Sequence, residues 1–118
     1  MASKNVSNIY VNPVRDNFLK SEGAVTLAIE NKNPFGVESK IKVEKFNDAK
    51  GIWETSCVLQ ASEGGLSPNS KIQEALQNNH FFKKGAGKYR IYYEFYKISV
   101  VQFAFKLGTL TTSVFNIK

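Results

Sequence analysis

The chain has 118 residues, of which 42% are hydrophobic and 22% charged, and its formal net charge at pH 7 is +6. At this length about two-thirds of the extended-chain surface can be buried, so an ordinary hydrophobic core needs no disulfide or metal to support it. Charged or amide side chains interrupt every apolar stretch, which excludes a membrane-spanning helix. We therefore expect one soluble globular domain over residues 1–118.

The positive charge comes almost entirely from lysine, because Arg15 and Arg90 are the only arginines among the 16 basic residues. Scattered lysines act as solvated point charges, whereas arginine supplies the planar fork that reads bases or clamps phosphates. This composition disfavours a sequence-specific reader of nucleic acid.

Cys57 is the single cysteine, so no intrachain disulfide can form. Its isolation favours a reducing compartment or a fold that needs no bridges. The N-terminus has no apolar segment of the kind that a signal peptide requires. Met1, Ala2 and Ser3 could instead replace a removed leader, so localisation stays open.

The first half of the chain alternates in hydrophobicity with a period of two, which is typical of β-strands. Val25, Leu27 and Ile29, for example, share one face of their segment, and Pro13 suits the end of a strand at a sheet edge. We expect strands over 6–12, 24–30, 37–46 and 52–59, the last two joined as a hairpin by the turn 47–51.

The second half begins with a loop over 61–69, which is rich in glycine, serine and proline. Ser70 and Gln73 then have the spacing of a capping box, and Ile72, Ala75 and Leu76 lie on one helical stripe. These residues predict a short helix over 71–78, with an irregular strand as the alternative. The strongest β pattern follows over 88–97, and further strands are expected over 100–107 and 109–117.

Seven or eight short strands, with turns at intervals of about ten residues, predict an all-β, antiparallel two-sheet sandwich. The absence of βαβ alternation excludes a doubly wound sheet and a TIM barrel. Within this pattern, Gly87-Lys88-Tyr89-Arg90-Ile91 resembles the G-x-Y-x-C stretch that begins strand F of immunoglobulin-like domains, including those of bacterial surfaces and phage particles. The resemblance implies that Tyr89 is a structural tyrosine-corner residue and Trp53 the buried tryptophan of a central strand. Ile91 stands where antibody domains have a cysteine.

Residues of catalytic or metal chemistry are few. His80 is the single histidine and has no acidic neighbour at a metal-binding spacing. No G-x-S-x-G elbow is present, and Cys57 lies within a β pattern that predicts a buried, inert thiol. We therefore expect no enzyme, no cofactor and no bound metal.

The strand over 88–97 carries the residues that we expect at an interface. If Tyr89, Ile91 and their alternate neighbours fill the core, then Arg90, Tyr92 and Tyr96 point outward. Tyrosine and arginine are common at binding hot spots. The alternative is that both tyrosines only cover neighbouring strands.

Two loops offer further candidate contacts. Asn33 and Phe35 lie in the turn 31–36, and Lys83, Lys84 and Lys88 form the densest basic cluster. Such a cluster is typical of a solvated hairpin loop, and phosphate contact through lysines and backbone N–H groups is the alternative.

Together these observations predict a non-enzymatic interaction or structural module, such as a surface or virion decoration protein, that binds a protein partner or itself. A terminal strand over 109–117 could pair with another chain. One alternative is a carbohydrate-binding sandwich that uses Tyr92, Tyr96 or Trp53 as a stacking platform. Another is an inhibitor of a protease or other enzyme, acting through the loops 31–36 and 83–87.

Overall fold

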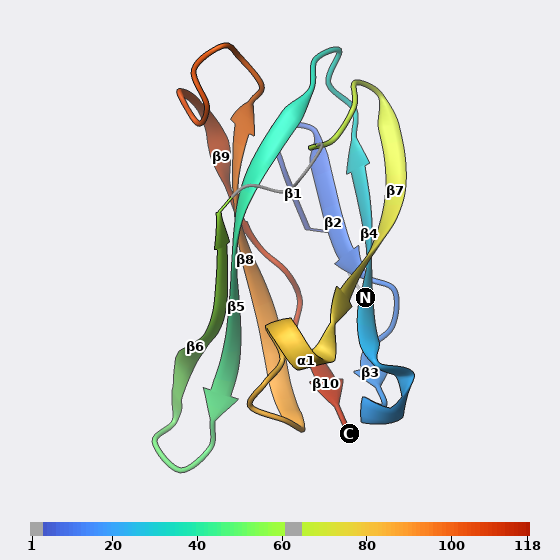
Figure 1. Ribbon diagram of the computed structural model, residues 1–118, viewed down its shortest axis with the longest axis vertical. Helices are drawn as coiled ribbons and strands as arrows, with labels where there is room; N and C mark the ends of the chain where they lie inside the picture. The colour runs from blue at the N-terminus through green and yellow to red at the C-terminus, as the bar shows by residue number, and fades with distance from the viewer. Residues whose placement is uncertain (1–3, 61–64) are drawn as a thin grey trace.

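The computed structural model describes residues 4–60 and 65–118, with the side chains of 59 and 60 excepted, and it folds as two packed β-sheets (Figure 1). The smaller sheet contains, in spatial order, β1 (Lys4–Val6), β2 (Ile9–Pro13), β4 (Ala24–Asn31) and β7 (Ser70–Gln77). The larger sheet contains β3 (Asn17–Phe18), β10 (Phe115–Ile117), β8 (Gly87–Lys97), β5 (Val37–Asn47) and β6 (Ile52–Gln60). β9 (Phe105–Thr111) pairs with the later half of β8, beyond the stretch that pairs with β10. The all-β class and the two-sheet arrangement are confirmed.

The structure has more strands than the seven or eight expected, because some predicted segments divide. The first predicted strand is a hairpin of β1 and β2, joined at Ser7 and Asn8, whose φ angles of 47° and 61° fit a two-residue turn of type I′. Short β3 and β10 pair in parallel, so the larger sheet is not wholly antiparallel. Met1 to Ser3 and part of the predicted loop 61–69 lie outside the described residues.

The predicted helix over 71–78 was wrong. Those residues form β7, which pairs with β4 at eight successive positions from Ala24–Gln77 to Asn31–Ser70. The ladder of backbone hydrogen bonds to β4 outweighs a local capping signal, since propensity alone is a weak determinant. The helices among residues 4–60 and 65–118 are the 3-10 turn η1 (Lys20–Glu22) and the single-turn α1 (Asn78–Phe81), which begins where β7 ends.

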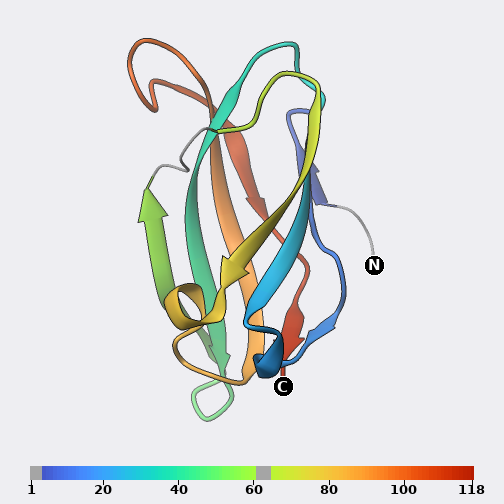
Figure 2. The ribbon, with the colours of Figure 1, turned by 45° about the vertical axis from the view of Figure 1, so that its right-hand side comes forward.

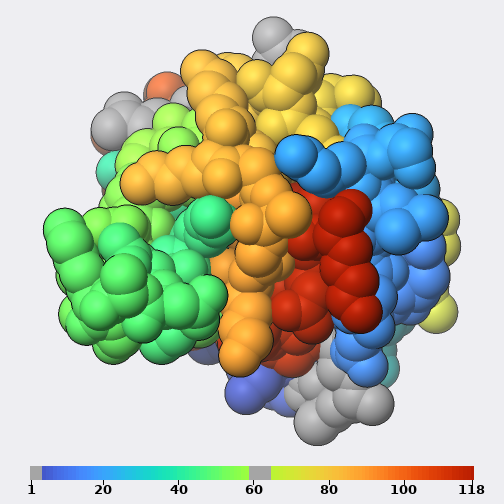
Figure 3. Space-filling model, turned by 90° about the horizontal axis from the view of Figure 1, so that it is seen from below, coloured from blue at the N-terminus to red at the C-terminus, as the bar shows by residue number. Residues whose placement is uncertain are grey.

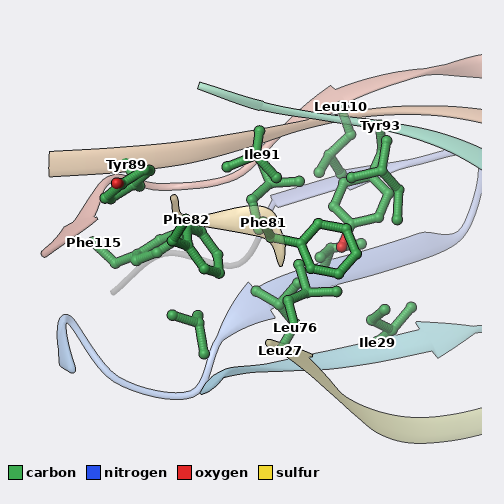
Figure 4. Close-up of a cluster of buried hydrophobic side chains, with 14 of the residues drawn as sticks. Leu27, Ile29, Leu76, Phe81, Phe82, Tyr89, Ile91, Tyr93, Leu110 and Phe115 are labelled. Carbon is green, nitrogen blue, oxygen red and sulfur yellow. The ribbon is translucent and has the colours of Figure 1, made fainter. Parts of the chain in front are cut away.

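The core fills the space between the two sheets (Figure 4). Alternate residues of β4, β5 and β8 are buried, as their period of two predicts. Phe82, just after α1, packs edge-on against Tyr89 and Phe115 at ring-centroid distances of 5.0 and 5.9 Å. These rings close one end of the sandwich.

The molecule is elongated, with extents of 42 × 24 × 23 Å, and its connections gather at two ends. In Figure 1 the upper end carries the β4–β5 turn and the β8–β9 loop, residues 98–104. The lower end carries the β5–β6 turn and the loop 82–86 before β8. The two ends are therefore separate surfaces.

Candidate functional site

The outer surface of the larger sheet carries cationic and aromatic side chains from three neighbouring strands. Side chains alternate across a strand, so the residues of β5 and β8 that do not enter the core project outward on one face. The register sets Lys42 opposite Tyr92 and Phe46 opposite Trp53. We call this set the basic-aromatic face: Lys40, Lys42, Phe46, Trp53, Lys88, Arg90 and Tyr92.

Trp53 is not the buried tryptophan of a central strand, so that expectation was wrong. It lies on β6, at the edge of the larger sheet, and is only half-buried. A register shift opposite Val43 and Glu44 inserts one extra residue into β6, between Cys57 and Thr55. A bulge of this kind inverts the facing of the rest of the strand. Cys57 therefore packs against the core while Trp53 projects outward beside Phe46, at a centroid distance of 5.2 Å.

Arg90 occupies the middle of the face and is held from two sides. Its guanidinium carbon lies 4.2 Å from the centre of the Trp53 ring, and its Nε donates a 2.8 Å hydrogen bond to Oε1 of Glu44. The other Glu44 oxygen lies 3.6 Å from Nζ of Lys42. This hydrogen bond uses the Nε hydrogen and not a terminal amino group of Arg90.

Tyr92 lies under Lys42, whose Nζ is 5.2 Å from the ring centre. Lys40, Lys42, Tyr92 and Glu94 line a cavity of about 170 Å³ together with Ile41 and Val58. Hydrogen bonds from Tyr96 and Tyr92 lower the pKa of Glu94, so this carboxylate is charged at neutral pH. The cavity thus offers two cations, one anion and an aromatic ring.

A second, larger concavity lies toward the lower end of the face. It has a volume of about 340 Å³ and is lined by Phe46, Trp53, Lys88, Val114 and Asn116. Aromatic rings form one wall, and an ammonium group and an amide stand on the other side. This combination suits a flat ring that carries an anionic group.

Tyr96, predicted as an exposed contact, was placed wrongly. It projects from the outward side of β8 but is only 7% exposed, because the β8–β9 loop folds over it. The Phe103 ring lies 5.2 Å from that of Tyr96, and the Phe103 N–H donates to Oε2 of Glu38 at 2.8 Å. A hydrogen bond to Glu94 raises the pKa of Tyr96 to about 12. Arg90 and Tyr92 do lie together on the open part of the face.

The candidate loop residues do not form one site, because they lie at opposite ends of the molecule. Asn33 is buried, and its side chain bonds to the Ser7 carbonyl and to Asn31 Oδ1, so its role is structural. Phe35 is half-buried beneath Lys97. Both belong to the upper end, whereas Lys83, Lys84 and Lys88 belong to the lower end.

Figure 3 shows the lower end, where the basic loop (orange) lies between the β5–β6 turn (green) and the C-terminal segment (red). Lys84 Nζ is 3.9 Å from Oε1 of Glu54, and Lys45 Nζ donates to the Lys84 carbonyl. Lys88 alone of the predicted basic cluster joins the basic-aromatic face.

Tyr89 makes the contact that a tyrosine corner makes. Its ring is fully buried and its hydroxyl donates a 2.6 Å hydrogen bond to the Gly85 carbonyl. Burial raises the pKa of Tyr89 to about 12.

His80 and Cys57, the single histidine and cysteine of the chain, lie apart from the basic-aromatic face. His80 is exposed and its ring lies edge-on against Phe81, while Cys57 is half-buried. Within 4–60 and 65–118 no group of three or more His, Cys, Asp or Glu side chains is placed to hold a metal ion. No helix in that part of the chain is long and apolar enough to cross a bilayer.

Sequence reasoning assigned Lys40, Lys42 and Glu44 to an ordinary solvated face and gave Phe46 no role. The available signal was that the outward positions of 37–46 and of 88–97 both combine cations with aromatic and acidic residues. Which of these residues are neighbours across strands depends on the strand register, and the register cannot be read from the sequence.

Comparisons with known proteins find a distant structural likeness and no family. No family model and no curated protein matches the chain. Among solved structures, it is similar to the Pseudomonas fluorescens alkylpurine DNA glycosylase AlkC bound to DNA containing an abasic site analogue, with a TM-score of 0.44 and 10% identity. The match covers 97% of this chain and 31% of that protein.

This comparison corrects the expected function. The interpretation as a surface or virion module was wrong, because a solved structure similar to this chain is a DNA glycosylase. The carbohydrate-binding and inhibitor alternatives gain no support either. At this TM-score and identity, the likeness carries no argument for glycosylase activity or DNA binding in this chain.

Proposed function

We propose that this domain is a non-enzymatic protein that binds single-stranded nucleic acid, without reading its sequence, through the basic-aromatic face. Proteins of this kind combine cations that follow the backbone with aromatic rings on which bases stack. The observation that carries the proposal is the pairing of ring and cation along one face: Arg90 on Trp53 at 4.2 Å and Lys42 on Tyr92 at 5.2 Å.

The charge of the face supports an anionic ligand. Lys40, Lys42, Lys88 and Arg90 stand against the three carboxylates Glu38, Glu44 and Glu94, on a chain whose net charge is +6. A positive surface attracts a polyanion from a distance and raises its rate of association. One of the two arginines of the chain lies at the centre of this face.

The two concavities support a stacked ligand. Trp53 and Phe46 form a wall of the larger one, where a base fits against the rings while Lys88 reaches its phosphate. A single strand can turn its base faces toward such rings, whereas a duplex keeps those faces stacked inside. Because ring stacking accepts every base, the ligand is recognised without sequence preference.

The test is a titration of a fluorescently labelled, mixed-sequence single-stranded DNA, followed by anisotropy. Trp53→Leu removes a stacking ring and should weaken binding roughly tenfold, since base–aromatic stacking contributes about 1–3 kcal/mol. Lys42→Gln with Lys88→Gln should weaken binding further and make it less dependent on salt.

The matched control is Lys32→Gln with Lys71→Gln, which removes the same charge outside the basic-aromatic face. Lys32 lies over the Tyr10 ring of β2, and Lys71 belongs to β7 of the smaller sheet. Equal losses in the control and the face variant would contradict a specific face. A duplex that binds as tightly as the single strand would contradict the stacking component.

We also propose that the domain is immunoglobulin-like. The Tyr89 hydroxyl bond to Gly85 at the start of β8 supports this assignment, as does the packing of two sheets with β8 central in one of them.

A further inference from the structure

The β8–β9 loop at the upper end has an unusual composition. Between Lys97 and Lys106 no residue is charged, and six of the eight residues are apolar. Four of them are exposed, and we call these the apolar tip: Ile98, Val100, Val101 and Phe105. A monomeric soluble protein seldom concentrates exposed apolar side chains in this way without a function.

The apolar tip is exposed at the end of a protruding loop (Figure 2). Val100 is fully exposed, and Val101 and Phe105 keep 65% and 58% of their surface accessible. Phe103, in the same loop, turns inward and packs on Tyr96 instead. The loop therefore buries one aromatic ring and presents its other large apolar side chains to solvent.

The loop is anchored at two points: the Ile98 N–H donates to the Gly36 carbonyl, and the Phe103 N–H donates to Glu38. These bonds tie the loop to β5 and to the turn before it. The outward direction of the valines is thus set by the fold.

Positive charge surrounds the apolar tip. Lys97 and Lys106 stand at its two stems and are exposed, and Lys32 lies in the β4–β5 turn at the same end. No acidic residue occurs from Lys97 to the last residue, Lys118. Glu38 of β5 accepts a hydrogen bond from the loop backbone, and Glu94 of β8 accepts hydrogen bonds from tyrosine hydroxyls on the sheet.

We propose that the apolar tip docks the domain onto the surface of an anionic lipid bilayer. Apolar side chains that enter the boundary between headgroups and acyl chains, flanked by lysines that meet anionic headgroups, provide the two contributions that stable peripheral binding needs. A bilayer can surround a convex tip on all sides, as the complete exposure of Val100 requires. The tip and the basic-aromatic face are different surfaces, so this docking goes beyond the proposed nucleic-acid binding.

Co-sedimentation with vesicles tests the proposal. One set contains phosphatidylcholine with about one-quarter phosphatidylserine, and the other contains phosphatidylcholine alone. The protein should sediment with the first set and much less with the second. Val100→Ser with Val101→Ser should reduce partitioning at least roughly tenfold, and Lys97→Gln with Lys106→Gln should reduce it about fivefold for each lysine, on anionic vesicles only.

Ile52→Ser is the matched control, because Ile52 is a similarly exposed apolar residue at the lower end. It should sediment like the unmodified protein. Unchanged sedimentation of the double valine variant, equal sedimentation with both vesicle sets, or none with either would overturn the proposal.

A dimer in gel filtration that the double valine variant abolishes would also overturn it, by showing that a second copy covers the tip. The double valine variant should keep its unfolding midpoint, since neither valine is buried. It should also bind single-stranded DNA like the unmodified protein, which keeps failure of this proposal distinct from failure of the proposed function.

Discussion

The guanidinium carbon of Arg90 lies 4.2 Å from the centre of the Trp53 ring, while Glu44 accepts the Nε hydrogen of Arg90 at 2.8 Å. The ring and the carboxylate therefore hold the guanidinium from two sides. The result is a positioned cation beside a concavity with an aromatic wall.

Arg90→Lys should weaken binding of single-stranded DNA about tenfold although the net charge is unchanged. An ammonium group cannot stack on Trp53 and bond to Glu44 in one planar arrangement as a guanidinium does. Anisotropy titrations measure the loss. Stability should change by less than about 1 kcal/mol, because the ion pair is partly exposed. Affinity equal to that of the unmodified protein would show that charge alone acts here.

Tyr89→Phe should lower the free energy of unfolding by about 1–3 kcal/mol, because the half-buried Gly85 carbonyl loses its donor. Urea denaturation measures the change. Tyr92→Phe is the matched control, since it removes a hydroxyl that bonds to Glu94 at the surface, and it should cost less than about 1 kcal/mol. A neutral Tyr89→Phe would remove the tyrosine-corner interpretation.

Tyr96→Ala should destabilise the fold by about 2–4 kcal/mol, because a 7% exposed ring and its contact with Phe103 are lost. Tyr92→Ala should cost less, because Tyr92 is only half-buried and lies on the open part of the face. Chemical denaturation of the two variants side by side gives the comparison. A larger loss for Tyr92→Ala would mean that the loop does not cover Tyr96 in solution.

Glu74→Gln should stabilise the protein at pH 7 and have little effect near pH 4. Burial raises the pKa of Glu74 above its ordinary value of 4.5, beside the buried Tyr93 ring. The folded state therefore holds this proton more tightly than the unfolded chain does. Protonation of Glu74 therefore stabilises the folded state. This contribution is fully present below the pKa of Glu74 in the unfolded chain, and it is lost as the pH rises through the pKa of Glu74 in the folded protein.

Urea unfolding of Glu74→Gln and the unmodified protein at both pH values measures the difference. Lower stability of the variant at pH 7 would contradict a desolvated carboxylate at this position.

The alternation of Val25, Leu27 and Ile29, and of Tyr89 and Ile91, was enough to predict the sheets and their buried faces, because hydrophobic burial follows the period of a strand. The structure of residues 70–77 was ambiguous from the pattern, and pairing with the distant strand β4 decided it. The capping signal at Ser70 and Gln73 predicted a helix, yet these residues pair with Asn31 and Ala28 of β4.

The candidate site was predicted only in part, for two physical reasons. Arg90 and Tyr92 follow directly from strand alternation. The outward direction of Trp53 does not follow from alternation. It depends on one extra residue in β6, which reverses the side of the sheet on which the following residues lie and leaves no mark in the composition of the strand. Tyr96 also escaped prediction, since its burial depends on a loop that returns from residue 103.

Trp53 fluorescence tests the proposed function most directly, because the chain has a single tryptophan and it forms a wall of the concavity assigned to a base. Titration with unlabelled single-stranded DNA should quench its emission to saturation, as a base stacks on the ring. Added salt should restore the emission as the DNA dissociates. Emission that stays unchanged while anisotropy reports bound DNA would place the nucleic acid elsewhere and contradict binding at the basic-aromatic face.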